Sequence, residues 1–195
     1  MKEKFEVLKC PDCGGCINAA LTCKSCMRKY ACEDDICDMM PSKEIVPALN
    51  IYNEPNYKKF YALQGETEGY LYRNKNPLIN WVQASGYRAI KRLFREHKGM
   101  ALECGCGTGI FQEIHGGIVP ENYIMLDADR CSLTKIKRRQ NLAAVIRGTN
   151  YRLPFVDCSF DVVISHAQLE HLAFLDLALE EIKRVLKPSG IFFAS

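Results

Sequence analysis

The segment from Ala101 to Gly109 (Ala-Leu-Glu-Cys-Gly-Cys-Gly-Thr-Gly) constrains the fold of this chain more than any other stretch. Its first residues are typical of the end of a buried strand, and residues 110–114 are typical of the start of a helix. Glycine at every second position allows a sharp turn and a close approach of the backbone to a ligand. A strand, a glycine turn and a helix N-terminus form a nucleotide site at the carboxyl edge of a parallel sheet. The alternative is a connection that only turns the chain.

The residues around the glycines narrow the class of nucleotide. A dinucleotide fingerprint needs glycine at the sixth position, which is Ile110 here, and no Lys-Ser or Lys-Thr follows the glycines as a P-loop requires. A carboxylate at Glu103 would repel a pyrophosphate and attract an ammonium group. A ligand with an adenosine end and an amino-acid end, such as S-adenosylmethionine (SAM), meets both demands.

A second acidic residue follows at a suitable distance. Residues 122–127 form an apolar run that ends in Asp127, 22 residues after Gly105. An acid about 20 residues after the glycine turn reaches the ribose hydroxyls of a nucleotide. The alternative role, capping of the next helix, suits Asp129 better because the helical pattern begins directly after it. Asp127 is therefore predicted to bind the ligand.

A third segment, residues 148–171, contains a Leu153-Pro-Phe155 turn and then a β-branched strand at Phe160–Ser165. Together with the glycine loop and Asp127, this order of motifs resembles the class I SAM-dependent methyltransferase family, in its small-molecule-type branch. Residues 181–193 resemble the helix that leads into the fifth strand of the family. The resemblance covers about residues 76–195. It implies an α/β fold with a Rossmann-like, doubly wound sheet.

The resemblance also implies a role for each matching residue. Glu103 and the glycine loop would hold the methionine end of SAM, Asp127 the ribose and Ala128 the adenine, while the residues after the fourth strand would lie near the reacting methyl group. The implied cofactor-binding set is Glu103, Gly105, Cys106, Gly107, Gly109, Asp127, Ala128, Thr149, Asn150, Ser165 and His166. The family has an acid at the position of Thr149 that accepts a hydrogen bond from the adenine amino group. Here Thr149 or Asn150 could accept that bond.

Two histidines are candidates for the general base. His166 is the first choice. His171 is the weaker one, because residues 169–172 are typical of the start of a packed helix. A structural role for either stays open, since a lone histidine is more often structural than catalytic.

The first 40 residues have a different pattern. Two Cys-x-x-Cys knuckles, Cys10/Cys13 and Cys23/Cys26, are separated by nine residues, which predicts one tetrahedral, structural Zn²⁺. The segment is too short for a core of its own, so metal would supply much of its folding free energy. Disulfides are the alternative. The N-terminus has no signal-peptide pattern, so a reducing, cytoplasmic location is expected.

The module resembles the small zinc ribbon found beside, or fused to, some methyltransferases. Cys16 could replace Cys13 as a ligand. The other cysteines are interpreted as small buried hydrophobes: Cys32, Cys37, Cys104, Cys106, Cys131 and Cys158.

The predicted organisation is a zinc ribbon at 1–40, an aromatic-rich linker at 41–76 and a SAM-binding domain at 77–195. The linker aromatics are expected to pack the ribbon onto the second domain, with a lid over the cofactor as the alternative. A helix is predicted from Pro77 to about Lys98. Its apolar stripe is Ile90, Leu93 and Phe94, and its basic face is Arg88, Lys91, Arg92 and Arg95.

The family sheet has seven strands, whereas this sequence stops at Ser195, in or just after strand five. Residues 191–194 would then form an apolar sheet edge, which proteins normally cover. A fragment or truncated chain is the favoured explanation. The alternatives are a partner or second copy that covers the edge, and a natural remnant with impaired activity.

The predicted function is methyl transfer from SAM to an acceptor, expected to be a small molecule or biosynthetic intermediate, by direct attack of a positioned nucleophile. The basic helix face and residues 135–139 keep an RNA substrate (rRNA or tRNA) open, although a net charge of +3 is short of a dedicated nucleic-acid binder. A further alternative is a catalytically impaired partner subunit that retains the fold and binds SAM, or binds no cofactor. No stretch approaches the roughly 20 apolar residues of a membrane span.

Overall fold

The computed structural model describes residues 6–42, 55, 59, 77–109, 122–139 and 144–194. Most of the predicted linker, with its aromatic residues, and the helix predicted after Gly109 lie outside these ranges. In chain order the described elements are β1 (Cys32–Glu33), β2 (Ile36–Asp38), α2 (Pro77–Glu96), β3 (Ala101–Cys104), β4 (Tyr123–Asp127), α4 (Arg130–Arg139), β5 (Ala144–Arg147), β6 (Phe160–Ser165), the 3-10 turn η3 (Leu169–His171), α5 (Leu175–Val185) and β7 (Leu186–Ala194).

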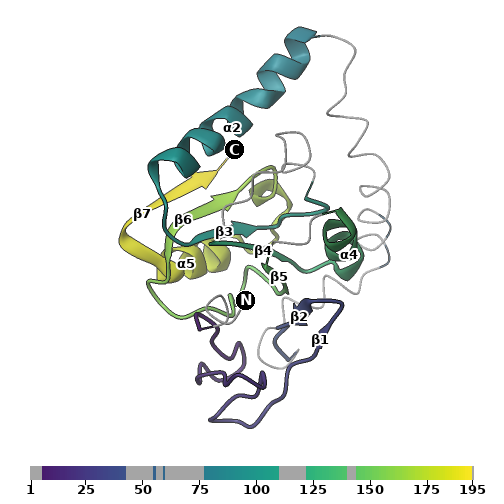
Figure 1. The fold of residues 1–195 in the computed structure, drawn as a ribbon, viewed down its shortest axis with the longest axis vertical. Helices are drawn as coiled ribbons and strands as arrows, with labels where there is room; N and C mark the ends of the chain where they lie inside the picture. Colours follow the sequence, from purple (N-terminus) through teal and green to yellow (C-terminus); the bar gives the residue numbers. More distant parts are fainter. Residues whose placement is uncertain are drawn as a thin grey trace.

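The strands form one sheet of seven in the order β1-β2-β5-β4-β3-β6-β7 (Figure 1). Every neighbouring pair from β2 to β7 is parallel, and only β1 runs antiparallel to its neighbour. The α/β, doubly wound fold predicted from the sequence is confirmed, and the glycine-loop strand β3 lies inside the sheet between β4 and β6. The strand predicted at Phe160–Ser165 is β6, and the predicted fifth strand lies in β7 at an edge of the described sheet.

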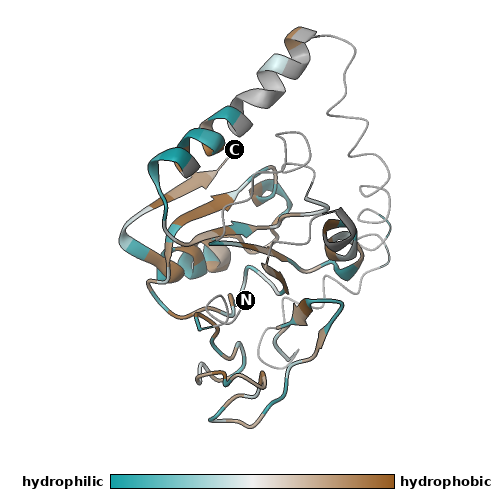
Figure 2. Cartoon of the chain, in the orientation of Figure 1, coloured by the Kyte–Doolittle hydropathy of each residue, from teal (hydrophilic) through white to brown (hydrophobic). Residues whose placement is uncertain are grey.

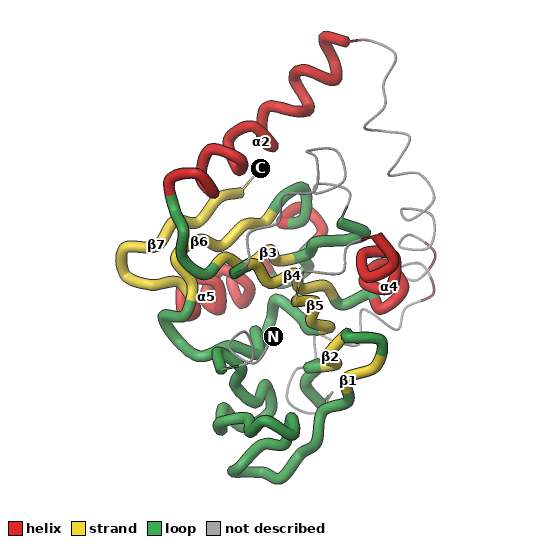
Figure 3. The backbone as a smooth tube through the Cα atoms, in the orientation of Figure 1, coloured by secondary structure: helices red, strands yellow, loops and turns green. Residues whose placement is uncertain are grey.

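The N-terminal module joins this sheet, which the sequence did not indicate. Asp34 and Asp35 both have positive φ (53° and 59°) and connect β1 to β2 in a two-residue hairpin turn of the kind that suits antiparallel strands. The outer strand of the hairpin is β1, and β2 pairs with β5 in parallel register from Ile36↔Val145 to Asp38↔Arg147. Apart from this hairpin, the described residues of the module up to residue 42 form loops and turns (Figure 3).

The inner strands β3, β4 and β6 are almost entirely buried, as their apolar sequences require, and Figure 2 shows the hydropathy of these strands. On one face, Leu102 and Leu126 of the sheet pack with Ile182 of α5 and with Leu8 and Tyr30 of the N-terminal module in one cluster. The other face packs against Ile90 of α2 and against Leu133 and Ile136 of α4. The N-terminal module therefore shares the main core instead of standing apart from it.

Two helices form as the sequence predicts. In α2 the stripe residue Ile90 is fully buried, while all four residues of the basic face are exposed. Asp129 accepts hydrogen bonds from the backbone N–H groups of Cys131 (3.2 Å) and Ser132 (3.0 Å), so it caps the N-terminus of α4 as expected. Among the described helices, none is both long and apolar enough to cross a bilayer.

Candidate functional site

The glycine loop follows β3 at the carboxyl edge of the sheet. Gly105, Gly107 and Gly109 have φ values of +68°, +52° and +68°, which is backbone that residues with a Cβ rarely adopt. The N–H groups of Gly105 and Cys106 donate to the carbonyl of Leu126 at 2.8 and 3.1 Å, which fixes the start of the loop to β4. Gly105 also has no room for a side chain, because a Cβ there would lie 2.2 Å from Cγ of Gln168.

Asp127 ends β4 and holds two segments together. Its Oδ2 accepts from the N–H of Gly107 and its Oδ1 from the N–H of Asp129, both at 2.8 Å. The residue is 7% exposed. Each carboxylate oxygen can accept a further bond, so the acid can hold the loop and still accept from ligand hydroxyls.

Glu103 is the third residue of β3, where it pairs with Met125 of β4 and Ile164 of β6, and it is buried. The Tyr123 hydroxyl donates to its Oε2 at 2.5 Å. Such a bond offsets part of the free energy that burial of a carboxylate costs. Sequence reasoning missed Tyr123; the signal was its place in the apolar run before Asp127, on a strand paired with β3.

The segment after β5 carries the residues predicted to meet an adenine. Thr149 and Asn150 are 1% and 3% exposed. The Thr149 hydroxyl accepts from the backbone N–H of Tyr151 at 3.3 Å. Within the part of the chain that the structure describes, Oδ1 of Asn150 is buried without a hydrogen-bond partner. A buried, unpaired acceptor is expensive, which suggests that a donor from a ligand completes it.

The segment after β6 contacts the glycine loop through Gln168. Ser165 is fully buried and donates from Oγ to Oε1 of Gln168 at 2.9 Å. Gln168 was missed by the sequence analysis, although its side chain packs directly over Gly105. His166 is half-buried, and this burial lowers the pKa of its imidazole below 6.5, with Glu170 opposing the shift.

The prediction of a packed helix at residues 169–172 was wrong. Leu169–His171 is a single 3-10 turn without buried residues, His171 is exposed, and α5 begins only at Leu175. The reason is that no residue of this short turn contributes to the apolar face of α5, which consists of Ala178, Ile182 and Val185.

The four knuckle cysteines converge in the N-terminal module. The ligand sulfurs of Cys10, Cys13, Cys23 and Cys26 all lie within 4.8 Å of one another. The Cys10–Cys26 and Cys13–Cys23 Sγ distances are 3.7 and 3.4 Å, close to the roughly 3.8 Å between sulfurs of a tetrahedral Zn–thiolate site. Burial opposes ionisation of Cys23, but the N–H groups of Cys26 and Ser25 outweigh it and lower the pKa of its thiol to about 6. Cys16 is exposed and is not among the four.

The prediction that the remaining cysteines are buried was wrong for three of them. Cys104, Cys106 and Cys37 are buried as predicted, whereas Cys32, Cys131 and Cys158 are exposed. Cys131 lies in the first turn of α4 on its solvent side, and Cys158 has φ +53° in the turn before β6, where no core is available. Cys32 lies on the outer strand β1, and its Sγ accepts from Cys37 across the hairpin at 2.6 Å.

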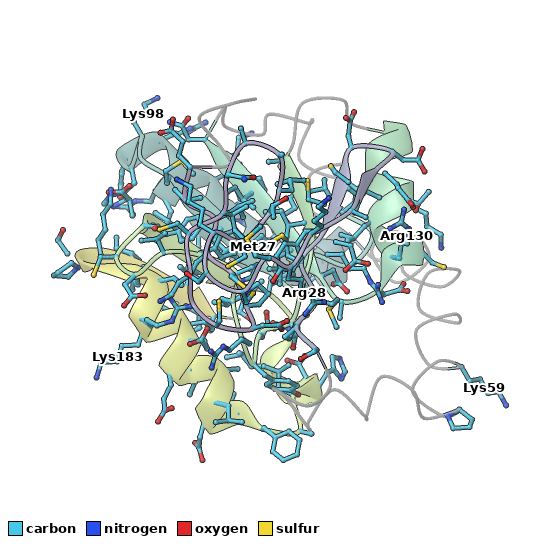
Figure 4. All side chains as sticks on the ribbon, turned by 90° about the horizontal axis from the view of Figure 1, so that it is seen from below. Met27, Arg28, Lys59, Lys98, Arg130 and Lys183 are labelled. Carbon is cyan, nitrogen blue, oxygen red and sulfur yellow. The ribbon has the colours of Figure 1, made fainter. Side chains whose placement is uncertain are left out.

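The predicted basic surface is only partly described. Arg92 is paired with Glu96 at 2.8 Å, and the guanidinium of Arg88 stacks on the ring of Trp81 at 4.8 Å. Of residues 135–139, the side chains beyond Ile136 are outside the description. Figure 4 shows Lys98, Arg130 and Lys183 at separate places around the molecule.

Comparison with known proteins gives the family of this site. Residues 102–194 match the family model described as methyltransferase domain. An S-adenosylmethionine-dependent methyltransferase of Mycolicibacterium smegmatis is 32% identical over 94 residues, covering 48% of this chain and 36% of its own. The malonyl-[acyl-carrier protein] O-methyltransferase of Yersinia pestis is 30% identical over 117 residues, and the match covers 60% of this chain and 43% of that protein. A tRNA methyltransferase 9B of Mus musculus is 26% identical over 126 residues, and the match covers 62% of this chain and 27% of that protein.

A solved structure has a similar fold. A crystal structure described as an S-adenosyl-L-methionine-dependent methyltransferase from Methanococcus maripaludis superimposes with a TM-score of 0.55 at 17% identity, over 71% of this chain and 63% of that one. The chain spans less than half the length of the curated relatives it matches. Residues 102–194 form a methyltransferase domain of the class I, SAM-dependent family.

Proposed function

We propose that this chain binds SAM and transfers its methyl group to a small molecule or biosynthetic intermediate. The observation that carries the proposal is the convergence of a glycine loop, two buried acids and an unpaired buried acceptor at one sheet edge. In this arrangement Glu103 and the loop (Gly105, Cys106, Gly107, Gly109) bind the methionine end, and Asp127 binds the ribose. Ala128, Thr149 and Asn150 surround the adenine, and Ser165 and His166 lie beside the transferable group.

The residues present fit this cofactor at its adenine end. The family acid is replaced by Thr149, whose hydroxyl is already bonded to Tyr151 N. Asn150 instead offers an unpaired Oδ1, which can accept from the adenine amino group. When bound, SAM supplies an electrophilic methyl group. The protein would position the acceptor in line with it and exclude water.

The N-terminal cluster fits a structural Zn²⁺. Cys10, Cys13, Cys23 and Cys26 would complete a four-thiolate shell, which leaves no open position for catalysis. The metal would therefore act by holding two loops together and not by activating a substrate.

The primary experiment is calorimetric titration of the zinc-loaded chain with SAM and with S-adenosylhomocysteine. We expect saturable binding with one site per chain, and Asp127→Ala is expected to weaken it at least tenfold, because a charged hydrogen bond is worth about 1.5–3 kcal/mol. Absence of binding by a folded chain would exclude an active enzyme and favour the partner-subunit alternative.

Asn150→Ala tests the adenine contact separately. We expect the Kd for S-adenosylhomocysteine to rise about fivefold to tenfold, as for one lost hydrogen bond of about 1 kcal/mol. The control ligand is S-inosylhomocysteine, which has a carbonyl in place of the amino group. Wild type should prefer the adenosyl ligand, and Asn150→Ala should lose that preference. An unchanged preference would show that Asn150 does not read the amino group.

His166 is the candidate general base, and its pH dependence has a defined sign. Since burial lowers its pKa below 6.5, the imidazole is neutral at pH 7 and able to accept a proton. The methyl-transfer rate should fall as the pH drops through this lowered pKa and stay flat above 6.5. His166→Gln should reduce single-turnover rates about 100-fold or more and remove that low-pH limb. The Kd for SAM should change far less than the rate, because the residues proposed to hold the two ends of the cofactor are retained. A variant that retains the limb would assign it to another group.

An RNA acceptor is the second candidate function. It is supported by the exposed basic face of α2 and by the tRNA methyltransferase among the relatives. RNA binding should weaken steeply as salt is raised, because phosphate contacts release counterions. Filter binding between about 50 and 200 mM salt would separate this candidate from a small-molecule acceptor.

A further inference from the structure

The N-terminal module contacts the segment that carries Asn150. Arg152, two residues further on, donates from Nε to the carbonyl of Pro11 at 2.8 Å and from Nη2 to that of Asp12 at 3.4 Å. These carbonyls lie between Cys10 and Cys13, the two ligands of the first knuckle. The guanidinium therefore lies against the turn that a metal would fix.

The same arginine closes the turn around Asn150. Its backbone N–H points to the carbonyl of Thr149 at 3.4 Å, so residues 149–152 form a tight loop. Tyr151 within this loop is buried and its ring packs edge-on against Phe174, 5.7 Å between centroids. Arg152 is thus joined to Thr149 through the backbone, and Asn150 lies between the two ends of this loop.

Backbone bonds extend this contact along the chain. Lys9 N donates to the carbonyl of Pro154 at 3.0 Å, and Val156 N donates to the carbonyl of Val7 at 2.8 Å. The residue that donates to Pro154 directly precedes the ligand Cys10. These two backbone bonds therefore place the Cys10–Cys13 knuckle beside Pro154, which follows the loop of residues 149–152.

A second arginine connects the module to the ribose side. Arg147 donates from Nη1 to Oδ2 of Asp38 in β2 at 2.7 Å and from Nε to the carbonyl of Ala128 at 3.1 Å. Ala128 directly follows Asp127. The module thus contacts both segments proposed to bind the adenosine, and Arg152 is the residue that contacts the first cysteine knuckle.

Other groups hold the same turn from the opposite side. Arg184 of α5 donates to the carbonyls of Leu153 and Phe155 at 2.9 and 2.7 Å, and Oε2 of Glu181 accepts from Leu153 N at 2.7 Å. These contacts fix residues 153–155. Residues 149–152 lie beyond them. Tyr151 holds this loop to the segment before α5, since its hydroxyl accepts from Ala173 N at 3.1 Å, and Arg152 holds the loop to the N-terminal module.

We infer that Arg152 is a positioning residue that makes adenosine binding depend on metal in the N-terminal knuckles. The inference rests on the proposed function. Metal holds the Pro11 and Asp12 carbonyls in place, these hold the guanidinium, and the guanidinium holds Asn150 where the adenine amino group would bind. The module then acts as a built-in support for the cofactor pocket.

The test measures how metal removal and Arg152→Ala, singly and together, change the Kd for S-adenosylhomocysteine. The Kd is measured by calorimetry, and the four states form a double-mutant cycle. In the zinc-loaded chain Arg152→Ala should raise the Kd at least fivefold, and adenosine alone should show the same loss because the affected contact is at the adenine. Chelation should raise the Kd at least tenfold in wild type. In Arg152→Ala the further loss on chelation should be clearly smaller. Equal losses in both backgrounds would overturn the inference.

Lys9→Ala is the matched control. It removes another cationic contact between the same segments, the Nζ–Asp157 ion pair at 3.0 Å, but leaves the Lys9 backbone bond and Arg152 intact. Its Kd should stay within about twofold of wild type, as expected for an exposed ion pair. A loss equal to that of Arg152→Ala would assign the effect to general docking of the module.

Hydrogen exchange gives a readout that does not need the cofactor. Amides of residues 149–152 should lose protection in zinc-loaded Arg152→Ala, while β3 and β6 keep theirs. On chelation, the loss at residues 149–152 should exceed the loss in β3 and β6 that follows from the lower stability of the whole domain. Lost protection without any binding of S-adenosylhomocysteine would contradict the proposed function and leave the positioning role supported. Binding with unchanged protection would overturn the positioning role alone. Bound zinc, measured by mass spectrometry, should stay at one per chain in Arg152→Ala.

Discussion

Replacement of Cys23 by serine is expected to abolish tight metal binding and to destabilise the whole domain. Cys23 is fully buried and its Sγ accepts from the N–H groups of Ser25 and Cys26 at 3.4 and 3.5 Å. Structural Zn²⁺ contributes on the order of 10 kcal/mol to the folding of small modules. A shell with one thiolate missing should lose much of this, so we expect the free energy of unfolding to fall by about 3–5 kcal/mol.

The loss should not stay within the N-terminal module. Leu8 and Tyr30 pack in the same cluster as Leu102 and Phe155 of the sheet domain, and β2 is hydrogen-bonded to β5. An unfolded module would expose this shared core and leave β5 as an open sheet edge. One cooperative transition at a lower midpoint is therefore expected, not two separate ones.

The measurement combines metal content with denaturant unfolding. Cys16→Ser is the matched control, since Cys16 is an exposed cysteine of the same module outside the cluster of four. It should keep one zinc per chain and the wild-type midpoint. Metal loss in Cys16→Ser would identify Cys16 as a ligand, and retention of zinc by Cys23→Ser would refute the predicted ligand set.

Gly105→Ala is expected to weaken SAM binding about 100-fold while the fold is retained. A residue with a Cβ in the left-handed region is disfavoured by roughly 1–2 kcal/mol. The new Cβ would also lie 2.2 and 2.3 Å from Cγ and Cδ of Gln168, so Gln168 must leave and its bond with Ser165 is lost. Together the two effects amount to about 3 kcal/mol. The site is expected to lose affinity because the loop moves off the methionine end of the cofactor.

The double variant Gly105→Ala/Gln168→Ala separates the two causes. Removal of the glutamine side chain leaves the backbone strain and relieves the clash, so binding should recover by about tenfold relative to Gly105→Ala. Gln168→Ala alone should have a small effect on the Kd. Calorimetry with S-adenosylhomocysteine gives the affinities, and circular dichroism confirms that each variant is folded. Wild-type affinity in Gly105→Ala would exclude the glycine loop as the cofactor site.

Local patterns were sufficient for most of the methyltransferase domain. The glycines, the acid that ends β4 and the strand β6 are each specified by residues adjacent in the chain, so their interpretation needed no tertiary information. The two knuckles likewise bring together four thiols whose spacing alone indicates one tetrahedral site. The capping role of Asp129 was predictable for the same reason, because its partners lie two and three residues away.

Long-range contacts could not be predicted in this way. Tyr123 and Gln168 enter the site through strand pairing and loop closure, and nothing in their own neighbourhoods distinguishes them from core or surface residues. The exposure of Cys131 and Cys158 was missed because a cysteine carries no local signal of burial. Each of these errors concerns which partner a residue meets in space.

The sequence by itself therefore determined the chemistry of this protein: a glycine loop with two acids, and four thiols at metal-ligand spacing. The tertiary structure alone decided how the two parts are joined. The pairing of β2 with β5, and of Arg152 with the carbonyls of Pro11 and Asp12, links residues about 110 to 140 positions apart through backbone groups that every residue carries. Because such bonds do not depend on side-chain identity at the accepting end, no sequence motif predicts them, and only the folded chain places the first cysteine knuckle beside the segment proposed to contact the adenine.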